Sequence, residues 1–176
     1  MSFHVRPFAE SDVDPLMKLR NHVISSSLFI YENHIWDFAD ATNWYNELKG
    51  DGRIALTAES GGEFAGCVYF SYFRRVSASR GLVELSVFVP EKFRRQGIAQ
   101  ALITAMEADL QRQGFFGMVA VIDIQNTGAI RLFEEQQFQK AGIIDNAAFL
   151  RGTWRSMMLL HKQIPNNFQS TQETNS

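Results

Sequence analysis

The stretch VELSVFVPEKFRRQGIAQALITA, residues 83–105, decides the fold of this chain. Its first part alternates like a half-buried strand, and its last part has the 3.6-residue period of an amphipathic helix. A short basic turn containing Gly97 joins the two. The first N–H groups of a helix have no partners and carry partial positive charge, so this junction predicts a phosphate-binding site. An ordinary strand–helix unit with a basic turn is the competing interpretation.

The spacing around Gly97 excludes two common phosphate sites. A P-loop ends in Gly-Lys-Ser/Thr, and a dinucleotide fingerprint needs three glycines with an acidic residue about 20 positions further on. Neither pattern is present.

A second motif follows the predicted helix, which we expect to end at Gly114. Residues 117–122 read as a buried strand, and the sequence NTGAIRLF, residues 126–133, then opens a helix expected over 127–136. Asn126 is suited to be the N-cap of that helix, where its side chain would accept a backbone N–H.

The pattern Arg-x-x-Gly-x-Ala at 94–99, followed in order by Asn-x-x-Ala-x-x-Leu-Phe at 126–133, resembles the two signatures of the GNAT superfamily of N-acetyltransferases. The resemblance implies acetyl-CoA as co-substrate, with its pyrophosphate on the backbone amides of residues 95–100 and its pantetheine arm along residues 87–89. It also implies a contact between Asn126 and that arm. The cofactor-binding residues implied in this way are Val87, Phe88, Val89, Arg94, Arg95, Gln96, Gly97, Ile98, Ala99, Gln100, Asn126 and Phe133.

Glu84 is the candidate general base. In the alternating strand it shares a face with Leu82 and Phe88, so we expect partial desolvation and a raised pKa. The alternative is that Glu84 pairs with an arginine or lies at a solvated edge. The sequence VELSVFV resembles the phosphinothricin acetyltransferase branch of the superfamily, in which the matching glutamate is held to deprotonate the amine. This resemblance favours the catalytic interpretation.

Several positions depart from the family pattern. Phe133 stands where many members have tyrosine or histidine, and it has no proton to donate to a thiolate. Gln137 replaces an expected glycine, and the segment LRGTWRS at 150–156 keeps Gly152 and Trp154 but lacks the branch's lysine and aspartate. A non-catalytic acyl-CoA-binding regulatory module is therefore the second hypothesis.

The acceptor is expected to be the amine of a small molecule, such as an amino acid or an analogue, reacting directly in a ternary complex. An acetyltransferase acting on a polyamine or a protein amine is the alternative within the enzyme class. We place the acceptor site among aromatic residues between the first two helices, although core packing would explain the same residues. The candidate substrate-binding residues are Phe29, Tyr31, Trp36, Arg74 and Trp154.

Composition limits the other possibilities. A chain of 176 residues with 45% hydrophobic content suits one domain, expected over residues 1–163, with a polar and disordered tail at 164–176. The net charge of −2 does not suggest nucleic-acid binding, and no apolar run approaches the roughly 20 residues that span a membrane. The histidines lack metal-ligand spacing, so we expect no metal. Cys67, the single cysteine, is expected in the core. A chain with one cysteine and no signal peptide is more typical of the reducing cytoplasm, so we expect the protein there.

The expected fold is α/β: a mixed, mostly antiparallel sheet of about seven strands, splayed where acyl-CoA would enter, with helices on both faces. The sequence does not decide whether the chain forms a homodimer. Strands are expected at 4–8, 53–59, 63–74, 81–89, 117–122, 138–145 and 152–161, with two further helices at 12–25 and 40–48.

Overall fold

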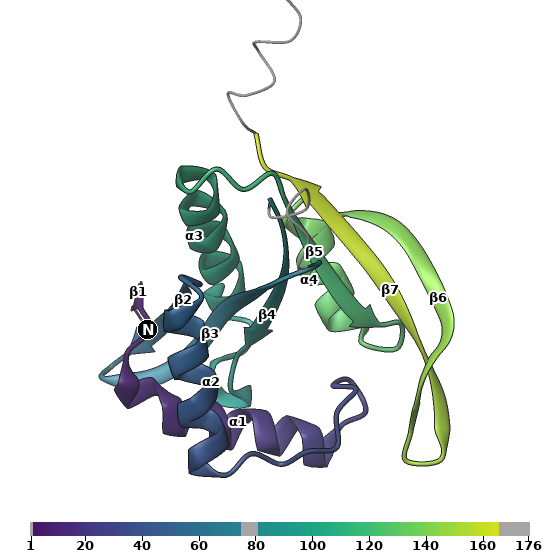
Figure 1. The fold of residues 1–176 in the computed structure, drawn as a ribbon, viewed down its shortest axis with the longest axis horizontal. Helices are drawn as coiled ribbons and strands as arrows, with labels where there is room; N and C mark the ends of the chain where they lie inside the picture. Colours follow the sequence, from purple (N-terminus) through teal and green to yellow (C-terminus); the bar gives the residue numbers. More distant parts are fainter. Residues whose placement is uncertain (1, 75–80, 166–176) are drawn as a thin grey trace, which may run out of the picture.

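The computed structural model describes residues 2–74 and 81–165, which form one seven-stranded sheet with four α-helices (Figure 1). The strands are β1 (Phe3–Pro7), β2 (Ala55–Ser60), β3 (Glu63–Tyr72), β4 (Leu82–Phe88), β5 (Gly117–Asp123), β6 (Gln139–Leu150) and β7 (Thr153–Gln163). The helices are α1 (Val13–Ser26), α2 (Phe38–Gly50), α3 (Ile98–Arg112) and α4 (Thr127–Glu135). Strand order is β1-β2-β3-β4-β5-β7-β6, and only the β4–β5 pair is parallel. The predicted fold class is confirmed.

Most boundaries fall within a few residues of the prediction, and the differences have local causes. Helix α2 begins at Phe38 because Asp37 and Asp40 exchange side chain to backbone hydrogen bonds of 2.8 and 3.0 Å, a reciprocal cap that the sequence analysis missed. Strands β6 and β7 run longer than predicted, because a two-residue turn with positive φ at Arg151 and Gly152 joins them as one hairpin.

At the C-terminal side, the packed part of the chain extends past the predicted start of the tail. Ile164, which we assigned to the polar tail, is buried in the core, and its N–H donates to the C=O of Phe116 at 2.8 Å. The remainder of the tail, from residue 166, lies outside the described residues.

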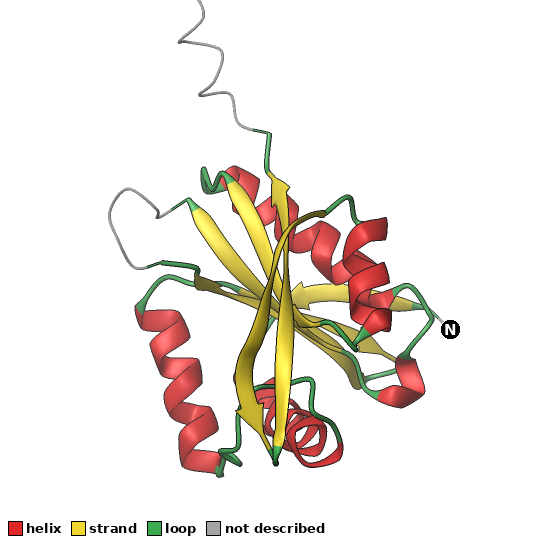
Figure 2. Cartoon of the chain, turned by 90° about the vertical axis from the view of Figure 1, so that its right-hand side faces the viewer, coloured by secondary structure: helices red, strands yellow, loops and turns green. Residues whose placement is uncertain are grey.

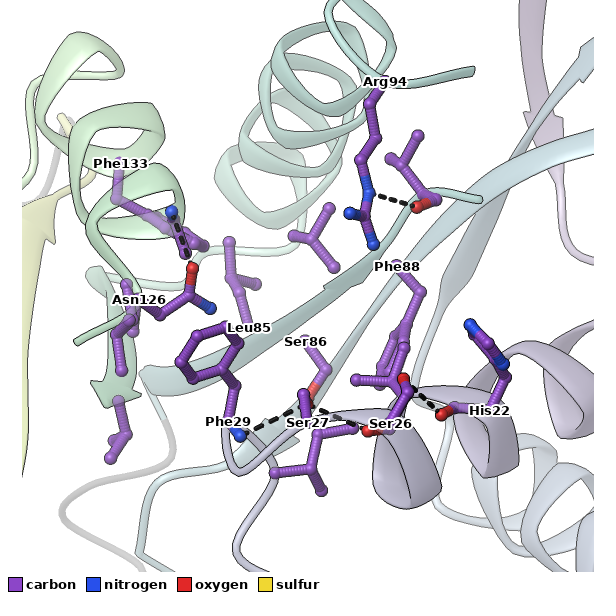
Figure 3. A pocket seen from close by; sticks show the side chains of 18 of the residues that line it. His22, Ser26, Ser27, Phe29, Leu85, Ser86, Phe88, Arg94, Asn126 and Phe133 are labelled. Carbon is purple, nitrogen blue, oxygen red and sulfur yellow. Dashed lines mark hydrogen bonds between the residues drawn. The ribbon is translucent and has the colours of Figure 1, made fainter. Parts of the chain in front are cut away.

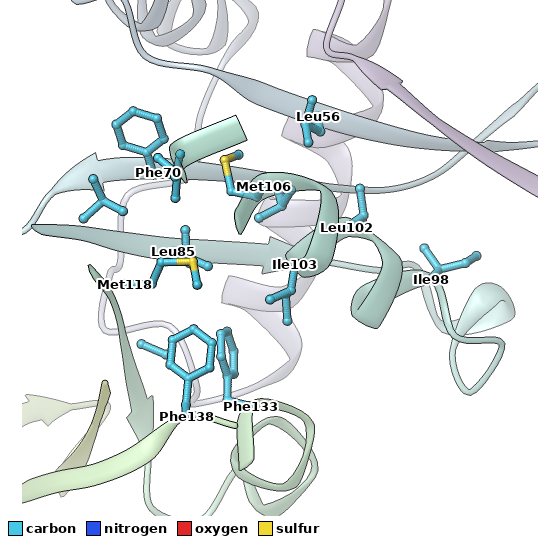
Figure 4. Packing of buried hydrophobic residues seen from close by; sticks show 14 of the residues in the cluster. Leu56, Phe70, Leu85, Ile98, Leu102, Ile103, Met106, Met118, Phe133 and Phe138 are labelled. Carbon is cyan, nitrogen blue, oxygen red and sulfur yellow. The ribbon is translucent and has the colours of Figure 1, made fainter. Parts of the chain in front are cut away.

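The helices cover both faces of the sheet (Figure 2). Helices α3 and α4 pack on the larger core, where Leu102, Met106 and Phe133 meet the apolar face of β3, β4 and β5 (Figure 4). Helices α1 and α2 pack on the opposite face over a smaller core that includes Leu16 and Cys67. Cys67 is fully buried, as predicted.

Strands β4 and β5 separate after a short contact. Their parallel register covers only residues 82–84 of β4, paired with residues 117–119 of β5. Beyond Glu84, β4 remains paired with β3 through Phe88 and has lost its other neighbour. Unpaired strand edges inside a sheet leave backbone N–H and C=O groups available to a ligand. The expected splay is therefore present.

Gly66 on β3 allows this arrangement. A Cβ there would lie 2.7 Å from the C=O of Phe88 and 3.1 Å from a methyl group of Val89. We therefore expect Gly66→Ala to lower the free energy of unfolding by roughly 1–2 kcal/mol, because β4 must shift to relieve the contact. Urea denaturation measures the loss, and Gly142→Ala is the control, since nothing lies within 4 Å of its added Cβ. Equal stability of the two variants would contradict the prediction.

Candidate active site

Two adjoining cavities, each of about 540 Å³, occupy the gap opened by the splay of β4 and β5. The first contains Glu84 and is bordered by the end of α1, and the second lies at the start of α3. The two cavities share lining residues, so they form one continuous cleft. The shared residues are Val87, Val89, Arg94, Asn126 and Ala129.

The start of α3 carries unpartnered backbone donors. Within the described part of the chain, no acceptor binds the N–H groups of residues 95–100, and no side chain caps the helix. The turn is held open by left-handed backbone at Arg95 (φ 59°) and Gly97 (φ 80°). The space above Gly97 is open, because a Cβ there would meet only the side-chain oxygen of Gln100, at 3.8 Å. This corner suits a diphosphate.

The side chains around this corner divide into two groups. Those of Arg94, Arg95 and Gln100 line the second cavity. Gln96, also predicted to bind the cofactor, does not line the second cavity, and its side chain donates to the C=O of Lys92 at 3.1 Å.

The main chain of β4 faces alternate neighbours at successive residues, as in any strand. The C=O of Gly81 accepts an N–H from the residue before β5 at 2.7 Å, whereas that of Leu82 accepts one from the end of β3 at 3.2 Å. By this alternation, Val87 turns its backbone groups into the gap, and Phe88 turns its own toward β3. Val89 follows the end of β4, and its C=O accepts the Arg94 side chain at 3.4 Å. Of the three residues predicted to align pantetheine, Val87 has suitable main-chain geometry within the strand.

Asn126 and Phe133 bring α4 to the same cleft (Figure 3). Asn126 is the N-cap of α4, and its side-chain oxygen accepts the N–H of Ala129 at 3.2 Å, as predicted. Phe133 is buried and packs edge-on against Phe138, with ring centroids 4.9 Å apart, so its ring forms part of an apolar wall.

Glu84 projects from β4 into the first cavity. No hydrogen bond or ion pair joins its carboxylate to another side chain in residues 2–74 and 81–165, so the expected alternative of an arginine partner is not found in this part of the chain. Burial raises the pKa of Glu84 above its ordinary value. A carboxylate of this kind, half-buried beside a cleft, is suited to accept a proton near neutral pH.

The far wall of the first cavity comes from the end of α1 and the loop after it. Phe29, a predicted acceptor residue, lies there next to residues that the sequence analysis did not select. The serine run at 25–27, directly after an amphipathic helix, was the one signal that could have found them. The missed residues are His22, Val23, Ser26, Ser27 and Ile30.

The other predicted acceptor residues line neither cavity. Trp36 packs on Trp44 beneath the guanidinium of Arg20, and Arg74 is exposed at the end of β3. Trp154 is 60% exposed on the β6–β7 hairpin.

Tyr31 lies instead beside a buried ion pair. Its hydroxyl is 2.9 Å from a carboxylate oxygen of Asp123, which Arg155 binds through two nitrogens at 2.6 and 2.7 Å. Burial alone would raise the pKa of Asp123, but the hydrogen bonds from Arg155 hold it below its usual value. The predicted aromatic cluster is thus dispersed, and these residues have separate surroundings.

The described residues contain neither a candidate metal site nor a membrane-spanning helix. No three His, Cys, Asp or Glu side chains among them gather in a way that could hold a metal ion. None of their helices has the length and apolar character needed to cross a membrane. Cytoplasmic location and homodimer formation stay predictions.

A family model, described as the acetyltransferase (GNAT) family, matches residues 21–138, which include both signatures and Glu84. The chain belongs to this family. The resemblance and the enzyme class inferred from the sequence, an acetyltransferase, are therefore confirmed.

Similar proteins agree with this assignment. The chain is 26% identical to the phosphinothricin N-acetyltransferase of Streptomyces viridochromogenes over 155 residues, covering 87% of this chain and 83% of that one. It is 24% identical to an L-methionine sulfoximine/L-methionine sulfone acetyltransferase of Pseudomonas paraeruginosa, and the match covers 91% of this chain and 94% of that one. The solved structure of a phosphinothricin acetyltransferase from Sinorhizobium meliloti in complex with AcCoA has the same fold, with a TM-score of 0.88 and 24% sequence identity. The match covers 93% of this chain and 89% of that one.

Proposed function

We propose that this GNAT member transfers an acetyl group from acetyl-CoA to the amine of a small molecule, an amino acid or an analogue of one. One observation carries the proposal: the unpartnered N–H groups of residues 95–100, the open edge of β4 and the carboxylate of Glu84 border a single cleft. We further propose that residues 1–163, together with the buried Ile164, form one acyltransferase domain.

The residues of the cleft suit acetyl-CoA. The start of α3 would hold the pyrophosphate through backbone donors, with the positive charge of Arg94 and Arg95 beside it. The backbone of Val87 and Val89 would align the pantetheine arm along β4. Bound in this way, acetyl-CoA supplies an activated thioester at the end of the cleft nearest Glu84.

The transfer needs an uncharged amine. Glu84 takes a proton from the acceptor's ammonium group, directly or through water, and the freed lone pair then attacks the thioester carbon. The backbone N–H of Val89, directly after β4, is the donor that we propose to stabilise the oxyanion that develops. The C–S bond breaks and the thiolate leaves, while the acylated nitrogen gives up its second proton; that proton reaches the thiolate through water or a hydroxyl, since Phe133 has no group that could relay it.

The choice of acceptor rests on the relatives. Two of them are named for phosphinothricin and for methionine sulfoximine or sulfone, which are amino-acid analogues. A polyamine would need a strongly acidic pocket, yet the acidic residues of the loop and α2 already have partners: Glu32 pairs with Arg20, and Asp40 caps α2. Amino acids and analogues are therefore the acceptors to test first.

Phe133 is the one departure from the family pattern that would suit the alternative hypothesis, a non-catalytic acyl-CoA-binding module, over the proposed transfer. A screen of amino acids, methionine sulfone, polyamines and peptides, with thiol release as the readout, separates the two. We expect release with at least one amino-acid analogue. Binding of acetyl-CoA without release by any amine would reject the catalytic proposal.

Asn126 gives a separate test of cofactor contact. Asn126→Ala should lower stability by about 1 kcal/mol through loss of the cap, whereas Asn126→Asp keeps a cap oxygen and should remain as stable as the parent. If the Asn126 amide also donates to acetyl-CoA, both variants should bind it roughly fivefold more weakly. Calorimetric titration measures this, and unchanged affinity in Asn126→Asp would limit Asn126 to its role as a cap.

A further inference from the structure

One short segment forms the acceptor side of the cleft. Residues 24–31 run from the last turn of α1 into the following loop, and we call them the strap. Four of them, Ser26, Ser27, Phe29 and Ile30, line the cavity that contains Glu84 (Figure 3). None lines the cavity at the start of α3. The position of the strap therefore sets the width of the acceptor side and leaves the phosphate side unaffected.

Arg151 holds the first end of the strap. It lies in the turn at the tip of the β6–β7 hairpin, which projects beside the end of α1 (Figure 1). Its guanidinium donates to the C=O of Ile24 and, at 3.2 Å, to the C=O of Ser25. The last carbonyls of a helix have no partner within the helix and carry partial negative charge. A cation from a turn 126 residues away in sequence thus binds the end of α1.

Tyr31 holds the second end. Its hydroxyl lies 2.9 Å from a carboxylate oxygen of Asp123 and 3.0 Å from the C=O of Ser156. The anchor point is rigid, because Asp123 and Arg155 are 0% and 4% exposed and bound to each other. Burial raises the pKa of Tyr31, so the phenol stays protonated and able to donate. The strap is therefore tied to β5 and to β7.

We propose that Arg151 and Tyr31 are positioning residues that hold the strap at the distance from Glu84 required by the acceptor amine. This inference rests on the proposed acetyltransferase function. It also reassigns Tyr31, which the sequence analysis placed in contact with the substrate. The consequence is specific: releasing either end widens the acceptor side, and the backbone donors that bind acetyl-CoA stay in place.

The test compares Tyr31→Phe, Arg151→Gln and the double variant with the parent. The KM of the acceptor should rise about fivefold in Tyr31→Phe, which loses one hydrogen bond to the Asp123 carboxylate, and about tenfold in Arg151→Gln, which loses the charged donor of two bonds. The dissociation constant of acetyl-CoA should stay within about twofold. Arg151→Lys should recover most of the loss, because an ammonium group also donates to carbonyls. Hydrogen exchange at residues 24–31 should accelerate in the three weakened variants.

The controls are Arg112→Gln, at the exposed end of α3, and Tyr45→Phe, on α2; neither residue lines the cleft, and neither should change the acceptor KM. Faster exchange in the strap with an unchanged acceptor KM would overturn the inference and leave the transferase function intact. An equal rise in the KM of acetyl-CoA would also overturn it. If the parent itself releases no thiol with any amine, the proposed function fails first, and the inference fails with it.

Discussion

Glu84→Gln is expected to lower kcat by about two to four orders of magnitude at neutral pH, the usual contribution of a positioned general base. The amide keeps the size and polarity of the side chain but cannot accept the proton of the acceptor's ammonium group. The affinity for acetyl-CoA should remain nearly unchanged, because Glu84 does not line the cavity at the start of α3. Steady-state rates and calorimetric titration together measure both quantities.

The pH dependence of both activity and stability should reflect the burial of Glu84, because burial raises the pKa of its carboxyl group. The basic form exists only above that pKa, so kcat/KM of the parent should rise with pH through it. Stability changes in the opposite sense. The folded chain holds this proton more tightly than the unfolded chain, so Glu84 favours folding below its unfolded pKa of about 4.3 and loses that contribution as pH rises through the folded pKa. Relative to the parent, Glu84→Gln should gain stability as pH rises from about 4.3 through the raised pKa of folded Glu84.

Glu47→Gln, on the exposed side of α2, is the matched control and should change neither rate nor stability. A fully active and correctly folded Glu84→Gln protein would exclude Glu84 as the base. A variant that is inactive and also fails to bind acetyl-CoA would show that the substitution damaged the cleft instead.

Gly97→Ala is expected to weaken acetyl-CoA binding by about a hundredfold or more. The added methyl group would occupy the open space above the turn and displace the diphosphate from at least two backbone donors. Hydrogen bonds to charged groups contribute about 1.5–3 kcal/mol each, so the loss of two gives this magnitude. Titration with acetyl-CoA and with free CoA measures the effect, and both ligands should be affected equally because they share the diphosphate.

Gly114→Ala provides the control for backbone strain. Gly114 has φ 79°, close to the 80° of Gly97, and an added Cβ there meets nothing within 4 Å. Both alanine variants should lose about 1 kcal/mol or slightly more of stability. Only Gly97→Ala should lose affinity. Similar binding by both variants would show that the diphosphate does not rest on this turn.

Local sequence was sufficient to predict the main-chain geometry of the corner that we propose to bind acetyl-CoA. The phosphate corner depends on main-chain groups, and their direction follows from a strand, a glycine at positive φ and a helix start, each with a sequence signal. The N-cap role of Asn126 and the raised pKa of Glu84 could be predicted in the same way, since one depends on position in a helix and the other on alternation in a strand.

The acceptor side could not be predicted from local patterns. Aromatic residues such as Tyr31 and Trp36 are equally suited to a pocket, a core or a polar anchor, and only tertiary contacts decide between these roles. The contact between Arg151 and the end of α1 joins residues more than 120 positions apart, and no periodicity in the sequence indicates it. The ion pair of Asp123 and Arg155 was missed for the same reason.

The strand order also determines when the site can form during synthesis. Strand β7 is the last to emerge from the ribosome, yet it lies between β5 and β6 and supplies Arg155. Until it is in place, Asp123, three residues before the cap of α4, lacks its guanidinium partner, and one edge of β5 is exposed. A nascent or prematurely terminated chain that stops before residue 153 therefore has all the signature residues but cannot complete the sheet that positions them.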